Sequence, residues 1–214
     1  MSYHVLYISS SSKPEEFSTS KQVGRYMLNQ LLQQHPDAII EELDLYTANI
    51  PMFNYKLFSS RATLPPPEEY EKLSDEEKQQ ITRINELCDQ FLRADRYIIT
   101  APMWSLFFPA ILKQYLDCII IQGKLIDVST NHVKGLLDDK ARKMVYIQSS
   151  GGTYPLIISW KLNQGAKYLE EIFGFLGVIS FKKVLVEGVD STDISKDEVM
   201  QYAKEDVDHL LRRF

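Results

Sequence analysis

Several features that mark particular protein classes are missing from this sequence. Only 2 cysteines occur among 214 residues. Both Cys88 and Cys118 fall on apolar faces of expected helices, so we predict reduced core thiols and no disulfide framework. Lys and Arg total 24 against 29 Asp and Glu, and no helix-like segment carries a basic stripe, which argues against a nucleic-acid partner. No apolar run approaches the roughly 18 residues that span a bilayer, and no signal-peptide pattern opens the chain; we expect a soluble, cytoplasmic protein that does not contact membranes.

Short motifs of several enzyme classes are missing as well. There is no glycine-rich dinucleotide fingerprint and no P-loop lysine motif. A serine hydrolase would need a Gly-x-Ser-x-Gly elbow, which does not occur, and none of the four histidines sits at an expected strand end. The many loop serines therefore do not indicate a hydrolase.

Strand-like and helix-like segments alternate five times along the chain. The apolar, β-branched runs lie at 4–9, 38–46, 96–101, 143–148 and 180–188. Helical periodicity follows each run, two helices begin with capping boxes at Ser74 with Glu77 and at Ser195 with Glu198, and Gly177 is expected to cap the helix that carries Leu162 to Leu176. This pattern predicts one α/β domain over residues 1–214, with a parallel sheet and helices on both faces.

Two segments interrupt the alternation. Residues 49–72 run without clear periodicity, and a loop of that length in a compact domain is usually functional or part of an interface. Residues 123–140 have no strong helix signal and are expected to form an extended excursion or a hairpin.

Three loops that leave strand ends have unusual compositions. In open parallel sheets, ligands bind outside the carboxyl ends of the strands. The loop "SSSSKPEEFSTS" at 9–20 leads hydroxyls and backbone N–H groups into a helix N-terminus, which suits a phosphate, although a serine-rich helix cap would look the same. The loop "QSSGGTYP" at 148–155 allows close backbone approach to a flat ligand, although a tight turn also favours Gly-Gly. The loop "PMWSLFF" at 102–108 adds apolar bulk. Together they match a planar ring with a phosphate tail, as in flavin mononucleotide (FMN).

Five segments resemble one known family, the FMN-dependent NADH azoreductases among the flavodoxin-like NAD(P)H quinone reductases. They are "FSTS" at 17–20, "PMWSLFFPAILKQYLD" at 102–117, "IQSSGGTY" at 147–154, "FGFLGV" at 173–178 and "VEGVD" at 186–190. The resemblance implies a flavodoxin-like, five-stranded parallel sheet of order 2-1-3-4-5. It also implies a homodimer with flavin sites near the subunit interface, and ping-pong transfer in which NADH or NADPH reduces bound FMN and the reduced flavin then reduces a quinone or an azo compound.

The resemblance also implies which residues bind the cofactor. Phosphate and ribityl contacts are expected from Ser11, Ser18, Thr19 and Ser20. Ring contacts are expected from Met103, Trp104, Ser105, Leu106, Ser149, Ser150, Gly151 and Gly152. No side chain is expected to act as a catalytic acid or base and no metal site is expected, because the cofactor carries the chemistry. We further hypothesise that the amides of Gly151 and Gly152 stabilise negative charge on the reduced ring.

The sequence departs from the family pattern near the ring. Ser105 and Phe107 stand where the family commonly has asparagine, and Leu125 and Ile126 replace an aromatic pair. Phe107 and Phe108 suit either the core or the substrate slot, and aromatic residues of the long loop, among them Phe53 and Tyr55, are candidates for its wall. The main alternative function is an FMN electron carrier to a protein partner. Carriers tend to be strongly acidic around the flavin, whereas these loops are apolar and nearly neutral, which favours the enzyme.

Overall fold

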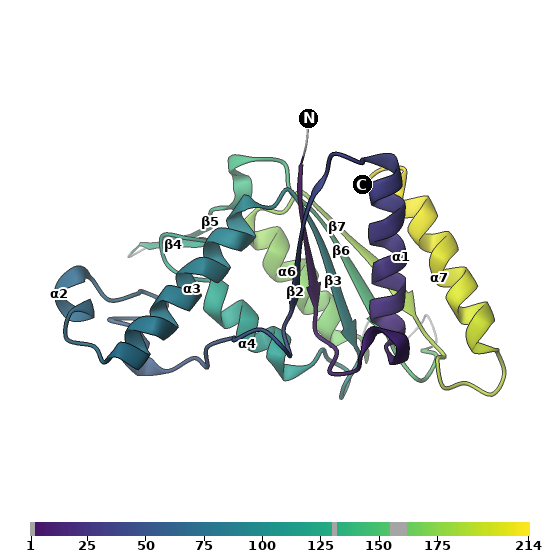
Figure 1. The fold of residues 1–214 in the computed structure, drawn as a ribbon, viewed down its shortest axis with the longest axis horizontal. Helices are drawn as coiled ribbons and strands as arrows, with labels where there is room; N and C mark the ends of the chain where they lie inside the picture. Colours follow the sequence, from purple (N-terminus) through teal and green to yellow (C-terminus); the bar gives the residue numbers. More distant parts are fainter. Residues whose placement is uncertain (1–2, 130–131, 155–161) are drawn as a thin grey trace.

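Five parallel strands form one sheet in the computed structural model, which describes residues 3–129, 132–154 and 162–214 (Figure 1). The strands are β1 (His4–Ser9), β2 (Ile39–Asp44), β3 (Arg96–Pro102), β6 (Lys143–Ser149) and β7 (Ser180–Val186), in the order β2-β1-β3-β6-β7. Every neighbouring pair is parallel. This is the topology of the predicted order 2-1-3-4-5. The labels differ because two further strands precede the fourth strand of the sheet.

Those two strands are β4 (Ile126–Ser129) and β5 (His132–Gly135), which pair antiparallel apart from the main sheet. They confirm the hairpin expected at 123–140, whose residues 130–131 lie outside the described ranges. Leu125, just before β4, and Ile126, its first residue, are buried in the core of this chain. Side chains that point into the core hold the base of the hairpin against the sheet domain.

Helices cover both faces of the sheet, as predicted. The helices α1 (Thr19–Gln34) and α7 (Lys196–Leu211) lie on one face, and α3 (Asp75–Arg93), α4 (Ala110–Ile119) and α6 (Gln164–Leu176) lie on the other (Figure 1). Val23, Met27 and Leu31 of α1 are almost fully buried, because the four-residue spacing places them on one stripe. The short helix α2 (Pro67–Tyr70) and the 3₁₀ turn η2 (Tyr55–Leu57) interrupt the long loop.

Sequence signals at the helix ends have the expected structures. Ser74 and Ser195 each form a full capping box with the glutamate three residues on. Gly177 ends α6 with a φ of 111°. The helix begins later than predicted, however: Asn163 is its N-cap, so Leu162 precedes it. The helix starts after Asn163 because the side chain of Asn163 accepts the N–H of Ala166 at 3.1 Å and so caps the N-terminus.

Strand ends differ from the predictions where side chains turn the chain. β2 stops at Asp44, two residues early, because the Asp44 carboxylate accepts the N–H of Tyr46 at 3.0 Å and its carbonyl accepts the N–H of Ala48 at 2.8 Å. β7 ends at Val186, also two residues earlier than predicted.

Cys88 and Cys118 are free and buried, as expected. Within the described ranges, no helix is both long and apolar enough to cross a membrane.

Candidate cofactor site

The register of the sheet aligns three strand ends. Pro102 pairs with Ser149, and Ser149 pairs with Val186, so the loops after β3, β6 and β7 begin side by side. On the other side of β3, Ser9 pairs with Thr100. The carboxyl edge of the sheet therefore collects four loops, and three of them are the loops singled out in the sequence.

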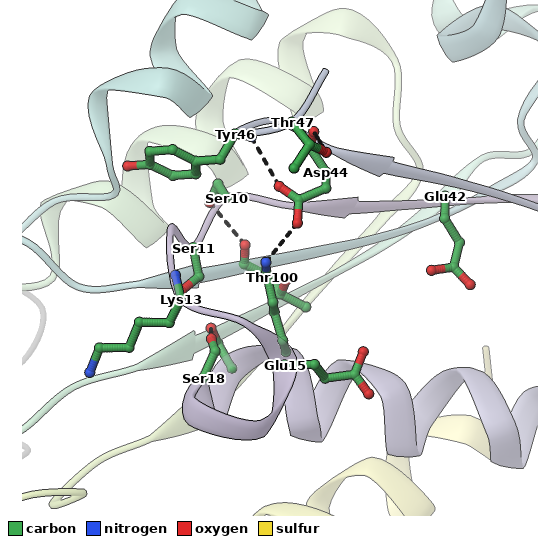
Figure 2. Close-up of polar contacts among 12 residues, drawn as sticks. Ser10, Ser11, Lys13, Glu15, Ser18, Glu42, Asp44, Tyr46, Thr47 and Thr100 are labelled. Atoms are coloured by element: carbon green, nitrogen blue, oxygen red, sulfur yellow. Dashed lines mark hydrogen bonds and ion pairs between the residues drawn. The ribbon is translucent and has the colours of Figure 1, made fainter.

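Serines of the loop after β1 have different tasks. Ser10 is structural: its N–H and its hydroxyl both donate to the carbonyl of Thr100 at 2.9 Å, which ties the loop to β3 (Figure 2). Ser11 accepts the N–H of Lys13 at 3.3 Å, which shapes the turn, and the hydroxyl of Ser18 lies 3.4 Å from that of Ser20. These contacts fix the hydroxyl groups of Ser11, in the loop, and of Ser18, at the start of α1.

The N-terminus of α1 differs from those of α3 and α7. Its N-cap Ser18 makes no side-chain capping bond, and its first turn contains no acidic residue. Both α3 and α7 have a capping box and acidic residues in the first turn. The first N–H groups of a helix need a partner, and the helix dipole favours a negative one. The N-terminus of α1 is therefore suited to bind an external anion such as a phosphate.

Ion pairs hold this end of α1 against the sheet. Lys21, whose side chain is 9% exposed, lies 2.6 Å from Asp44, at the end of β2. Arg25 bonds Glu42 in bidentate fashion and also reaches Glu15, which lowers the pKa of the Glu42 carboxyl. The charges of Lys21 and Arg25 are therefore neutralised within the fold.

The loop after β3 contains a strained two-residue turn. Ser105 and Leu106 have φ values of 49° and 63°, and Trp104 and Phe107 exchange backbone hydrogen bonds of 2.8 and 2.9 Å. Positive φ at both central positions is the pattern of a type I′ turn, which favours Asn-Gly. The turn leaves Trp104 and Leu106 47% and 39% exposed, and the N–H of Met103 donates to the carbonyl of Ser149 at 2.7 Å. The start of this loop is therefore fastened to the end of β6.

Backbone hydrogen bonds join the loop after β6 to the loop after β7. The N–H groups of Gly188, Val189 and Asp190 donate to the carbonyls of Gly152, Ser150 and Gly151, each at 3.1 Å. Within 149–152, the hydroxyl of Ser150 also donates to the carbonyl of Gly152 at 3.0 Å. Three successive bonds make the two loops one rigid wall.

A pocket of about 270 Å³ lies between these loops. Its lining includes eight of the residues predicted to bind the cofactor: Ser11, Ser18, Thr19, Met103, Trp104, Ser149, Ser150 and Gly151. The other four predicted residues are not part of the lining: Ser20, Ser105 and Gly152 each follow a lining residue directly, and Leu106 lies two residues after Trp104. Their cofactor contacts stay predictions.

The lining also contains residues that the sequence analysis did not select: Lys13, Phe17, Pro102, Val189 and Asp190. Lys13 and Phe17 belong to the serine-rich loop already chosen. Val189 and Asp190 follow β7, whose carboxyl end lies at the same edge, so the sheet argument could have found them. Phe53, Phe58 and Phe108 do not line the pocket: Phe53 stacks on Phe58 at 4.4 Å, and Phe108 is buried.

A larger hollow lies away from this edge. It has a volume of about 560 Å³ and is lined by residues at the start of β7 and the end of α7, at the opposite edge of the sheet. Within the described part of the chain, no three His, Cys, Asp or Glu side chains gather as metal ligands would.

Fold and pocket together define a class of protein. An anion-binding helix start beside a slot for a flat group, at the carboxyl edge of a sheet of this order, is the arrangement of flavodoxin-like nucleotide-binding proteins. The residues fit FMN: uncapped N–H groups and hydroxyls suit its phosphate, and the glycine turn and apolar loop suit its ring.

Comparisons with known proteins identify the family. A family model described as "Flavodoxin-like fold" matches residues 3–211. The chain is 44% identical over 207 residues to an FMN-dependent NADH:quinone oxidoreductase of Ruminiclostridium cellulolyticum, covering 97% of each chain. It is also 44% identical to FMN-dependent NADH:quinone oxidoreductase 1 of Clostridium acetobutylicum, covering 97% of this chain and 94% of that one. The crystal structure of an FMN-dependent NADH-azoreductase from Bacillus anthracis in complex with FMN superposes with a TM-score of 0.86 at 28% identity, covering 99% and 98% of the two chains. The chain belongs to this flavodoxin-like family of FMN-dependent NADH:quinone oxidoreductases.

Proposed function

We propose that the protein is an FMN-dependent oxidoreductase that uses NADH to reduce quinones and azo compounds. The observation that carries the proposal is the pocket at the carboxyl edge, where the uncapped start of α1 meets the glycine turn after β6. Relatives 44% identical over nearly the whole chain are FMN-dependent NADH:quinone oxidoreductases. Bound FMN would supply the redox chemistry, by accepting a hydride and passing two electrons to the acceptor.

The protein's own residues bind and orient the cofactor. The α1 N-terminus, with Ser11, Ser18 and Thr19, would hold the phosphate. Lys13 supplies positive charge there, because no described carboxylate pairs with its ammonium group, whereas the charged groups of Lys21 and Arg25 are both paired. Met103, Trp104 and the turn at 149–152 would hold the ring in one plane.

The exposed apolar surface beside the pocket supports an enzyme rather than an electron carrier. Trp104, Leu106 and Phe17 are 47%, 39% and 64% exposed. Such side chains can stack on planar acceptors, whereas a carrier relies on charge to steer a protein partner. The surface therefore favours small planar substrates.

Spectroscopy of the purified protein tests the assignment. We expect a bound-flavin spectrum that NADH bleaches under anaerobic conditions and that a quinone or an azo dye restores, with steady-state turnover of both acceptors. A flavin that resists NADH and NADPH would indicate the electron carrier instead. A titration with each nicotinamide would identify the preferred donor.

We also propose that the protein is a homodimer. Large apolar side chains are exposed on the long loop and on the turn after β3, including Met52 at 74% and Tyr55 at 79%, and exposed apolar side chains of this kind are typical of interfaces. Sedimentation or light scattering should give a mass near twice 24.8 kDa. A cytoplasmic location and one domain over residues 1–214 stay predictions.

A further inference from the structure

Asp190 occupies a fixed position in the wall of the pocket. It follows β7, and its N–H donates to the carbonyl of Gly151 at 3.1 Å, beside the bond from Val189 to Ser150. Both Asp190 and Gly151 line the pocket. The backbone thus holds the Asp190 side chain next to the glycine turn at which we place the ring.

Gly151 makes room for this carboxylate. A Cβ atom built on Gly151 would lie 2.4 Å from Oδ2 of Asp190, closer than Cβ atoms approach other atoms. A Cβ on the neighbouring Gly152 would meet nothing within 4 Å. Any side chain at position 151 would therefore require the Asp190 carboxylate to move from its present position.

The Asp190 carboxylate has no partner among the described residues, although its loop offers a contrast. Glu187 accepts the N–H of Tyr154 at 3.1 Å, whereas the carboxylate of Asp190 accepts no hydrogen bond and forms no ion pair with a described residue. The amides of Gly151 and Gly152 likewise donate to no described acceptor. This wall of the pocket therefore presents one strong acceptor beside two donors.

That pattern complements a cyclic imide, in which one N–H lies between two carbonyl groups. The isoalloxazine ring of FMN has such an edge. We propose, resting on the proposed function, that Asp190 is a specificity-determining residue that accepts the imide N–H of the flavin, while the amides of Gly151 and Gly152 donate to the ring carbonyls. A hydrogen bond to a charged group that becomes covered by the ring is stronger than a neutral one. Asp190 therefore selects flavins with a free imide N–H.

Binding of FMN and of FMN methylated at the imide nitrogen tests the proposal. Affinities are measured by fluorescence titration of the cofactor-free protein, of Asp190→Ala and of the matched control Asp193→Ala, whose aspartate lies in the same loop outside the pocket. The unchanged protein and the control should prefer FMN over the methylated flavin by about tenfold or more. In Asp190→Ala the preference should nearly disappear.

Each alternative outcome has one meaning. Equal preference for FMN in the unchanged protein and in Asp190→Ala would overturn the role of Asp190, as would an unchanged protein that does not discriminate. Asp190→Leu, which has nearly the shape of aspartate without its charge, gives the same test if the alanine variant does not fold. A protein that binds neither flavin would overturn the proposed function itself.

Discussion

At the scale of single residues, chemically similar side chains in the pocket loops do different work. Ser10 ties the loop after β1 to Thr100, whereas Ser11 and Ser18 line the pocket. The difference follows from the register of β1 and β3, which places Ser10 beside Thr100 and leaves the later serines at the carboxyl edge of the sheet. Substitutions within one loop therefore have separable effects.

Ser18→Glu should weaken FMN binding far more than riboflavin binding. The new carboxylate would stand at the uncapped start of α1, where it would repel the phosphate dianion and occupy its donors. Titration of both flavins measures the difference. Ser12→Glu, on the exposed side of the same loop, is the control and should change both affinities little. Equal losses for both flavins in Ser18→Glu would place the phosphate elsewhere.

Leu106→Gly should stabilise the folded protein by roughly 1 kcal/mol, because Leu106 is held at φ 63°, a conformation that costs a non-glycine residue about 1–2 kcal/mol. Chemical denaturation measures the free energy of unfolding. Leu185→Gly serves as the control: Leu185 is similarly exposed, at 37%, but lies in β7, where glycine is unfavourable. A destabilised Leu106→Gly would show that the exposed side chain contributes more than the strain costs.

At the scale of elements, ion pairs from the side chains of α1 hold this helix in position, while the N–H groups at its N-terminus have no side-chain cap. Lys21 and Arg25 connect its first two turns to β2 and to the preceding loop. The N-termini of α3 and α7 are instead closed by capping boxes, which satisfy the first N–H groups of those helices. The N-terminus of α1 can therefore stay open to a ligand without loss of position.

The Lys21–Asp44 pair should contribute to stability measurably. Its lysine is 9% exposed and its aspartate 32%, so we expect a coupling energy of about 1–2 kcal/mol from a double-mutant cycle of Lys21→Met and Asp44→Asn. The exposed pair Lys167–Glu171, 3.7 Å apart, is the control and should give less than about 0.5 kcal/mol. Similar values for both pairs would mean that water screens Lys21 as well.

At the scale of the whole molecule, the two helical layers seal ionisable groups inside the core. Burial raises the pKa of the Cys88 and Cys118 thiols to about 12 each. Both side chains are completely buried on the face covered by α3 and α4. They should behave as inert core residues while the fold is intact.

Alkaline pH should therefore destabilise the protein. In the unfolded chain the thiols ionise near pH 8.5, whereas in the fold they keep their protons up to about pH 12. The unfolded state then binds fewer protons, so stability falls with rising pH across this window, by up to about 1.4 kcal/mol per pH unit for each thiol.

Unfolding measured at pH 8 and pH 10 should show this loss, and it should be smaller in the variant Cys88→Ala/Cys118→Ala. A thiol reagent at pH 8 should label neither cysteine before denaturant is added. Rapid labelling of the native protein would show that the core opens on its own.

The success of the sequence predictions has physical causes. Strand and helix periodicities are local, so they located every strand of the sheet, both capping boxes and the cap at Gly177. Parallel strands place their carboxyl ends at one edge of the sheet, so the sequence alone was enough to assign three loops to one site. The start of α6 was missed because the Asn163 cap is a weaker signal than the apolar spacing that includes Leu162.

The sequence by itself determined the alternation of strands and helices, the edge at which ligands bind and the family to which the chain belongs, because each depends on local patterns or on segments read in order. Only the tertiary structure decided that Asp190 faces the pocket, that Ser10 does not, and that Gly151 accommodates a carboxylate. These depend on the pairing of Pro102 with Ser149 and of Ser149 with Val186, which brings together loops far apart in the chain. Contacts between distant loops leave no periodicity in the sequence.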